Sequence, residues 1–273
     1  MALLGESRIA VAGAIILLFW AAVALLAPIL PLADPNASGL PLQPIGGGEE
    51  NGATAWLGTD HLGRDMLSRL IWGARRVLIW ATLATATAYV VGMAMGAAAG
   101  YLGGWRDEAI SFVANILLSF PVMVLYIVVI AHFGASPLNI VLAVTFASAP
   151  GIMRIVRGLV LDLRTRDYVL AARTRGESAL YIMAVELLPN ARGPLVVDAC
   201  LRMGYTIVAL ATLGFLGLGL PPPDPDWGKM IAEAVPMGAF AGHAMVLPAI
   251  ALSSLVLGFN LLADGLREIA SRD

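Results

Sequence analysis

Two ionisable residues, Asp198 and Arg202, lie four positions apart in an otherwise apolar run at about residues 194–220. On a helix this spacing puts them on one face, where they can form an ion pair. Ionisable residues in apolar spans are costly, and they often pair or line a water-filled path. Because both lie within about two turns of one end of the run, we favour a structural pair. Contact with a water-filled path or with a partner protein is the alternative.

The chain lacks the residue pattern that binds nucleotide phosphates. That pattern is G-x-x-x-x-G-K-[ST], whereas the only lysine lies in the tripeptide GKM at 228–230, with Pro223 where the first glycine should be. His61, His132 and His243 are far apart in the sequence, so we expect no metal site. We find no pair of carboxylates, and no pair of a nucleophile and a base, at a spacing that would indicate a catalytic site. We therefore expect a protein that is not an enzyme and carries no cofactor.

A charged segment, GTDHLGRDMLSRL, occupies residues 58–70. It is typical of a solvated helix at a membrane interface, with Asp60 as the N-cap. The alternative is that Asp60, Arg64 and Asp65 contact another protein.

Residues 167–190, DYVLAARTRGESALYIMAVELLPN, predict a helical hairpin between two apolar runs. In its first helix Tyr168, Ala171, Ala172 and Arg175 share the spacing of one helix face. The alanines on that face leave room for another surface to approach closely. Gly176 can take the left-handed conformation that ends a helix.

The second helix of this hairpin runs from a cap at Ser178 through Leu187, and Pro189 follows just past its end. The segment is apolar nearly all round, so it should contact protein on most sides. Two interpretations follow from the residues alone. The hairpin either packs under its own helix bundle or docks on another subunit.

The composition indicates a protein that crosses a membrane several times. Of 273 residues, 59% are hydrophobic and only 13% are charged, whereas soluble domains average about 25% charged residues. The net charge of −2 suggests no nucleic-acid partner, and the single Cys200 cannot form an intramolecular disulfide.

A spanning helix needs about 20 mostly apolar residues. Six windows satisfy this requirement: 9–33, 77–102, 109–133, about 137–160, about 194–220 and about 243–264. The apolar run of the first window exceeds the 7–15 residues usual for a signal peptide, so we favour an uncleaved span. The fold class is therefore all-α, with six transmembrane helices.

Basic residues predict which side of the membrane each loop occupies, because short cytoplasmic loops collect positive charge. A six-span order puts eleven arginines on the side of both termini and the hairpin, against five basic residues opposite. The eleven are Arg8, Arg106, Arg154, Arg157, Arg164, Arg166, Arg173, Arg175, Arg192, Arg267 and Arg272. The five are Arg64, Arg69, Arg75, Arg76 and Lys229. Both termini and the hairpin should be cytoplasmic.

The two longest connections on the opposite side differ in character. Residues 34–56 are rich in Pro, Gly and Asn and predict irregular loop. Residues 221–236 begin with prolines and then predict a short helix with Trp227 near the interface.

Glycines and prolines inside the spans predict local geometry. Gly92, Gly96 and Gly100 repeat every four residues, which lets helices pack closely. We interpret the repeat as packing, with a moving seam as the alternative. Kinks are expected at the prolines inside spans, which are Pro121, Pro150 and Pro248.

The hairpin resembles the cytoplasmic signature loop of ABC importer permeases, which has the pattern Glu-Ala-Ala, three residues, Gly, nine residues, Ile-x-Leu-Pro. The residues that match in register are Ala171, Ala172, Gly176, Leu188 and Pro189. Leu170 replaces the glutamate and Glu186 replaces the isoleucine. Four further segments, at 57–75, 100–108, 118–125 and 213–231, resemble the second permease subunit of dipeptide, oligopeptide and nickel importers.

This resemblance implies a coupling helix that docks in a groove of an ATPase subunit. The implied coupling residues are Tyr168, Ala171, Ala172, Arg173, Arg175, Gly176, Glu177, Ser178, Leu188 and Pro189. It also implies that the residues outside the membrane, Asp60, Arg64, Asp65 and Trp227, contact a substrate-binding protein or the partner permease.

We therefore expect half of the translocation pathway of an ATP-driven importer in a bacterial inner membrane. Residues 1–75 would form an N-terminal region, and 76–273 the permease core with the signature loop at 162–193. The implied partners are a homologous permease, two ATPase subunits that bind ATP and Mg, an extracytoplasmic binding protein and lipid. The substrate could be a peptide, a nickel chelate, an opine or an oligosaccharide. The alternatives are a self-sufficient ion-coupled secondary transporter and a scaffold without transport activity.

Overall fold

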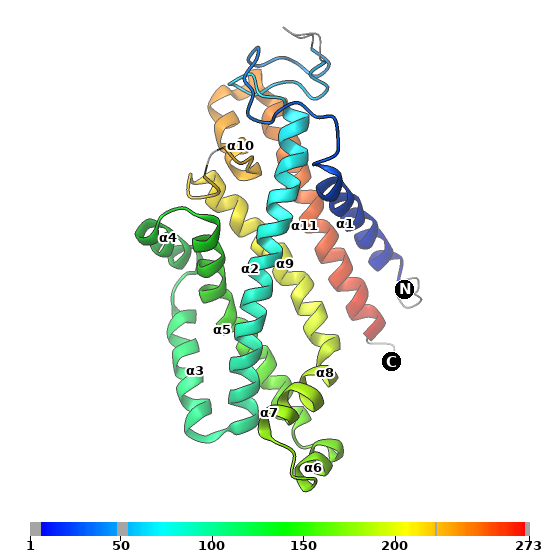
Figure 1. Cartoon of the computed structure of the whole chain (residues 1–273), viewed down its shortest axis with the longest axis vertical. Helices are drawn as coiled ribbons and strands as arrows, with labels where there is room; N and C mark the ends of the chain where they lie inside the picture. The colour runs from blue at the N-terminus through cyan, green and yellow to red at the C-terminus, as the bar shows by residue number, and fades with distance from the viewer. Residues whose placement is uncertain (1–6, 48–53, 222, 271–273) are drawn as a thin grey trace.

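A computed structural model describes residues 7–47, 54–221 and 223–270. In this part of the chain the structure is a helical bundle, elongated along the helix axes (Figure 1). The longer helices are α1 (Arg8–Leu26), α2 (Met66–Leu102), α3 (Gly104–Ser119), α4 (Val122–Phe133), α5 (Pro137–Leu163), α9 (Arg192–Phe215) and α11 (Gly242–Ala270). The short ones are α6 (Asp167–Thr174), α7 (Ala179–Tyr181), α8 (Leu188–Asn190) and α10 (Trp227–Ala234). A π-helical segment, Ile182–Leu187, joins α7 to α8, and a 3-10 segment, Val235–Ala241, follows α10.

The two ends of the bundle are different. The loop before α2 lies with α10 at one end, which we call the loop end, and the hairpin of α6 to α8 lies at the other, the hairpin end (Figure 1). The predicted irregular loop at 34–56 falls at the loop end; its residues 48–53 lie outside the described part. The first residues of α1 and the last residues of α11 both lie at the end of the helix that points toward the hairpin end (Figure 1).

Within the described ranges, five helices are long and apolar enough to cross a membrane: α1, α2, α5, α9 and α11. The predicted span at 109–133 is not a continuous helix, because α3 and α4 meet at an angle of 88°. Phe120 is extended, with φ −87° and ψ 140°, immediately before Pro121. Proline lacks an N–H and disfavours helical geometry in the residue before it, so Pro121 breaks the helix instead of kinking it. Pro150 and Pro248 lie inside helices that continue through them.

The centre of the bundle is the contact between α2 and α5. The glycine repeat of α2 had predicted close helix packing, and the structure shows that α5 is the partner. A methyl group at Gly92 would lie 2.6 Å from Ile152 Cβ, and one at Gly96 would lie 2.6 Å from Val156 Cβ. One at Gly100 would lie 2.9 Å from Val160 Cβ. Each distance is far below van der Waals contact, so the three glycines let the two helices lie against each other without a gap. The packing interpretation is confirmed.

The helix α2 begins earlier than the apolar window predicted. Its N-cap is Asp65, whose carboxylate accepts a hydrogen bond of 2.7 Å from Ser68 N, and Asp60 lies in the turn before it. The prediction of Asp60 as the cap was therefore wrong. Asp65 satisfies an otherwise free N–H of the first turn, and burial raises the pKa of its carboxyl group.

At the loop end, α10 is fixed by its first residues. The Asp226 carboxylate accepts hydrogen bonds from Lys229 N at 3.1 Å and Leu220 N at 3.2 Å, although burial raises its pKa. Trp227 is fully buried and donates from Nε1 to Leu70 O at 3.1 Å. A methyl group at Gly228 would lie 1.9 Å from Ala211 O. The short helix at 227–234 was predicted correctly, and the side chain of Trp227 is buried in the core of the protein.

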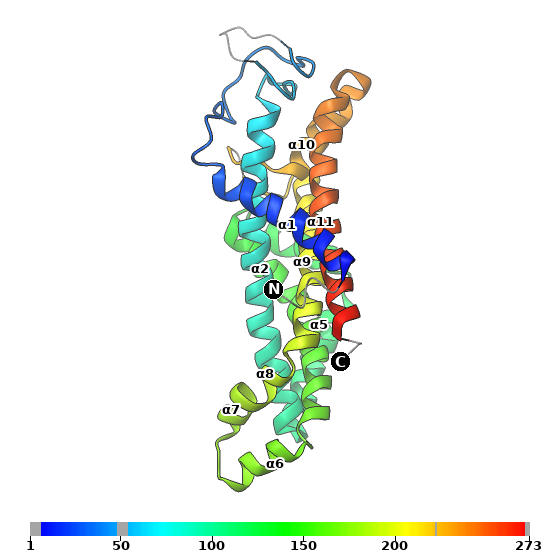
Figure 2. The same cartoon turned by 90° about the vertical axis from the view of Figure 1, so that its right-hand side faces the viewer.

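The first helix joins the bundle on its outside. Figure 2 shows α1 running obliquely across the bundle from α2 toward α11. Trp20 Nε1 donates to Ser254 Oγ at 2.9 Å, and a methyl group at Gly13 would lie 2.6 Å from Leu262 N. These contacts attach α1 mainly to α11.

The seam between α2 and α5 gives a first prediction. Gly96→Ala should destabilise the protein by about 1–3 kcal/mol, because the added methyl group overpacks a close helix contact. The measurement is the thermal unfolding midpoint of the purified protein in detergent, together with its abundance in the membrane. Gly158→Ala is the matched control, since a methyl group at this α5 position meets nothing within 4 Å. Equal midpoints for the two variants would contradict the close packing.

Candidate functional site

The hairpin turns at Gly176, which has φ +77° as predicted. Its N–H donates to Arg173 O at 2.9 Å, and Glu177 N donates to Ala172 O at 3.2 Å. These two bonds are the Schellman arrangement, which satisfies carbonyls at the end of a helix. Ser178 Oγ then accepts from Tyr181 N at 3.2 Å, so the predicted cap of the second helix is confirmed.

One side of the hairpin belongs to the protein's own core. Val169 and Ala172 of α6 are fully buried in a cluster with Ile182, Leu187 and Leu195. The face of α6 that was predicted to be free for another surface is therefore only partly exposed. Ala172 lies inward and Ala171 lies in solvent, because the buried stripe passes through 169 and 172.

The second helix had been predicted to end before Pro189, and this prediction was wrong. Helical structure continues from Ala179 to Asn190, and the turn before the proline is a π-helix. Proline cannot donate to the carbonyl four residues earlier and its ring crowds that group. The wider π turn accommodates Pro189 without ending the helix.

Other residues of the hairpin have large apolar side chains that are exposed. Leu180 is 73% exposed, Val185 49% and Leu170 47%. Together with the exposed Ala171 and Tyr181, these residues form what we call the hairpin patch. The interpretation that the hairpin only packs under its own bundle accounts for the buried side and leaves this patch unexplained.

Charged residues border the patch and are mostly paired. Arg175 lies 3.3 Å from Glu186 and 3.7 Å from Glu177. Arg173 lies over the ring of Tyr101 at 4.8 Å, a cation–π contact that joins α6 to the end of α2. Glu186, which replaces the isoleucine of the signature pattern, thus forms an ion pair with Arg175 across the hairpin turn.

Asp198 and Arg202 form the pair that their spacing predicted, with Arg202 Nε 2.7 Å from Asp198 Oδ2. A third member, Tyr89 of α2, donates its hydroxyl to the same carboxylate oxygen. Tyr89 could not be predicted as a member of this group, because it lies 109 positions away from Asp198. In the structure Arg202 is the eleventh of the 24 residues of α9.

At the loop end an ion-pair network joins the loop before α2 to α10. Arg64 Nε lies 2.6 Å from Asp60 Oδ2, and Arg64 Nη2 lies 2.8 Å from Glu233 Oε2. Arg69 approaches the same Asp60 oxygen at 3.5 Å. Asp60 Oδ1 accepts from the N–H groups of Leu62 and Arg64, both at 2.9 Å. Glu233 was not singled out from sequence, since its partner lies 169 positions away.

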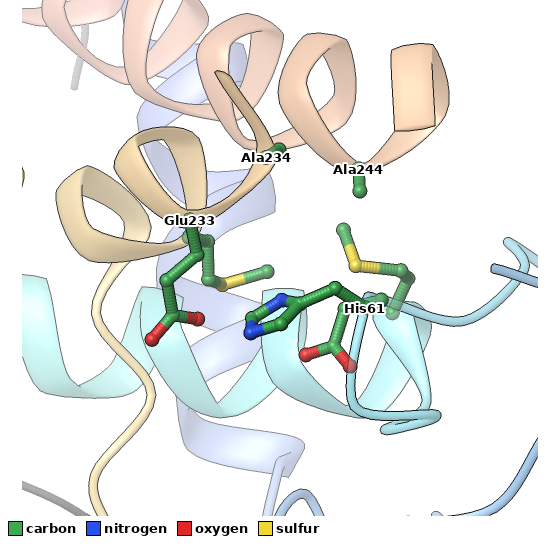
Figure 3. Close-up of a pocket in the computed structure, with 7 residues that line it drawn as sticks. His61, Glu233, Ala234 and Ala244 are labelled. Atoms are coloured by element: carbon green, nitrogen blue, oxygen red, sulfur yellow. The ribbon is translucent and has the colours of Figure 1, made fainter. Parts of the chain in front are cut away.

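This network includes a group that could hold a metal ion. Asp60, His61 and Glu233 each offer one ligand atom, and these atoms lie within 4.8 Å of one another. They line a small cavity of about 10 Å³ (Figure 3), which has room for about one water molecule. Arg64 already neutralises both carboxylates and both Asp60 oxygens have partners, so we assign the group to the ion-pair network.

The residues expected to contact a partner outside the membrane differ in their accessibility. Trp227 and Asp60 are buried, so their side chains offer no contact surface in this structure. Arg64 and Asp65 are partly exposed and remain candidates.

The profile of the family described as "Binding-protein-dependent transport system inner membrane component" matches residues 91–273. The chain is 35% identical to a dipeptide transport system permease protein from Alkalihalophilus pseudofirmus, over 97% of this chain and 86% of that protein. It is 36% identical to its counterpart from Haemophilus influenzae, over 96% and 90%. It is 39% identical to a glutathione transport system permease protein from Pectobacterium atrosepticum, over 78% and 71%.

Among solved structures, the chain is similar to one of the inward-facing MetNI methionine ABC transporter. The TM-score is 0.63 at 21% identity, over 76% of this chain and 98% of that chain. This likeness supports the fold.

The network at the loop end gives a second prediction. Arg64→Gln should destabilise the protein by roughly 2–3 kcal/mol, because it leaves the carboxylates of Asp60 and Glu233 without their shared cation in a largely buried site. The measurement is the thermal unfolding midpoint. Arg166→Gln is the control: its i,i+4 pair with Asp162 is mostly exposed and should contribute less than about 0.5 kcal/mol. A midpoint equal to that of the control would contradict a structural role for Arg64.

Proposed function

The chain belongs to the family of binding-protein-dependent transport system inner membrane components, as a permease subunit of an ABC importer, and we propose that its hairpin patch docks an ATPase subunit and that its cargo is a short peptide. Members of this family are multi-pass inner-membrane proteins that work with ATPases and a binding protein. The chain is not itself an enzyme, which agrees with the missing phosphate-binding motif.

The observation that carries the docking proposal is the exposed apolar side of the hairpin. Leucine and valine side chains exposed together outside the membrane-spanning helices are unfavourable in water and are typical of an interaction surface. The paired charges around them resemble the polar rim of a protein interface. We infer that the other half of the hairpin, buried between α6 and the π-helical segment, keeps the patch in a fixed orientation.

The positive charge bias supports a cytoplasmic location for the hairpin end and for both termini. In the structure the hairpin, with its arginines, lies at the hairpin end. The start of α1 and the end of α11 both point toward this end (Figure 1). The loop end, with the Arg64 network, would then face the binding protein. We propose a second, homologous permease and two ATPase subunits as the other members of the complex.

The proposed cargo follows from the relatives, whose names specify dipeptide and glutathione transport. A dipeptide and glutathione share peptide bonds and free carboxylates, so we propose short peptides as the substrate class. The comparisons give no specific support for nickel.

The mechanism needs the chain to pass movement from the hairpin to the membrane-spanning helices. Docked ATPase subunits that close on ATP would push the hairpin, which is joined to α2 through Arg173 and Tyr101. Arg164 Nη1 adds a second connection, a hydrogen bond of 2.9 Å to Gly100 O. Because α2 and α5 lack a gap between them, they would tilt as one body between two discrete packings, as alternating access requires.

A third prediction tests the docking proposal. Leu180→Asp puts a charge into the centre of the hairpin patch and should lower the amount of ATPase subunit that co-purifies with the tagged chain by at least tenfold, because an unpaired charge is costly in a buried contact. The measurement is mass spectrometry of a pull-down in mild detergent from native membranes.

Leu62→Asp is the matched control, since Leu62 is also an exposed leucine but lies at the loop end. ATPase subunits that co-purify equally with both variants would contradict docking at the patch. Uptake of labelled dipeptide by the purified importer in vesicles, with and without ATP, tests the proposed cargo separately.

A further inference from the structure

The outer face of α3 is apolar, and no other helix of the described chain covers it. Trp105 is 73% exposed, Phe112 66% and Ile116 45%. Their spacing of seven and four residues puts them on one face of the helix. Ala114 points the other way and is buried in a cluster with Met153 of α5. In Figure 1 α3 lies at the edge of the bundle, so its exposed face meets something outside the described chain.

The residue types of this face favour lipid over another helix. Interfaces between membrane helices are enriched in small residues, which let two backbones approach, as Gly92 and Gly96 do between α2 and α5. The exposed face of α3 consists mostly of large side chains, which also include Val113 and Phe120. Together with α4, this helix is apolar enough to count as a broken membrane span. These residues are therefore suited to contact acyl chains.

The first turn of α3 marks one boundary of the bilayer. Its residues 106–108 are all charged, and the chain then has no Asp, Glu, Lys or Arg until Arg154. Charged groups are costly inside the bilayer, and tryptophan is enriched at its interface. Trp105 therefore lies at the level of the lipid headgroups, and the apolar face that follows it points into the membrane.

An unpaired cation lies beside Trp105 at this level. Arg106 has no ion pair in the described part of the chain, whereas Asp107 of the same turn pairs with Arg157 of α5 at 2.6 Å. Arg106 is exposed, and its guanidinium carbon lies 5.8 Å from the centre of the Trp105 ring, a cation–π contact. Glu108 lies two positions on, about 200° around the helix axis. The planar guanidinium of arginine matches two oxygens of a phosphate group.

We propose that Arg106 and Trp105 bind the headgroup of an anionic phospholipid whose acyl chains lie along Phe112 and Ile116. The guanidinium contacts the phosphate group, and the indole ring lies at the boundary between headgroup and acyl chain. The inference goes beyond the proposed function and depends neither on the cargo nor on the docking of an ATPase subunit. The other possible occupant of this face is the partner permease.

The first test measures lipid preference by native mass spectrometry of the purified full chain, which is given equal amounts of phosphatidylglycerol and phosphatidylcholine. The unaltered chain should retain phosphatidylglycerol as its first lipid with a preference of about fivefold, the effect of one basic residue next to an anionic surface. Arg106→Gln should abolish this preference. Arg106→Lys keeps the charge and should stay within about twofold of the unaltered chain.

Arg166→Gln is the matched control, because it removes the same charge from an exposed arginine of the hairpin. Its lipid preference should be unchanged, and an equal loss in both glutamine variants would overturn the inference in favour of a general effect of net charge. An unaltered chain without any preference would also overturn it. Excess inorganic phosphate should not displace the lipid; displacement would show a site for free phosphate instead.

The second test identifies what covers the α3 face in native membranes. A photoreactive benzoylphenylalanine takes the place of Phe112 in the complete importer, and the cross-linked products are analysed by mass spectrometry. A phospholipid adduct is the expected product. A cross-link to the partner permease would overturn the inference and leave the proposed function intact.

Discussion

The contact between α2 and α5 determines how the rest of the molecule is arranged. In a membrane the hydrophobic effect does not drive helices together, so association depends on close packing. Gly92, Gly96 and Gly100 provide it, since each brings backbone against a branched side chain of α5. The helix α2 extends over the length of the bundle, with the Arg64 network at its start and the hairpin near its end, and α5 lies beside the part of α2 toward the hairpin (Figure 1). Because α2 and α5 are closely packed, a displacement at the hairpin would move the two helices together.

The hairpin has a buried side and an exposed side, and the residue types differ between them. Val169 and Ala172 pack inward, where small size permits close contact with the π-helical segment. Leu170 and Leu180 face solvent, where leucine has no structural reason to be. Position 170 has leucine where the family pattern has a glutamate. Position 186 has a glutamate, which pairs with Arg175, where the pattern has an isoleucine.

Much of this could be predicted from sequence, where the signal is local. Apolar length identified the spans, and the turn at Gly176 with its cap at Ser178 followed from residue types. The break between α3 and α4 was underestimated, since a proline inside a span can kink a helix or end it, and packing decides which. Tyr89 and Glu233 could not be found, because each meets its partner only after the chain has folded. Trp227 was expected near the interface because tryptophan is enriched there, and its burial could not be predicted, since its neighbours Leu70 and Trp20 are remote in sequence.

The exclusion of charge from the hairpin patch has a consequence for the conditions under which the complex holds together. Hydrophobic association weakens on cooling, whereas contacts between exposed charges weaken as salt rises. With its apolar centre and with Arg175 already paired within the hairpin, the joint that we propose between this chain and an ATPase subunit should tolerate high ionic strength and loosen in the cold. Purification at low temperature, the usual precaution for a fragile membrane complex, would then favour its dissociation.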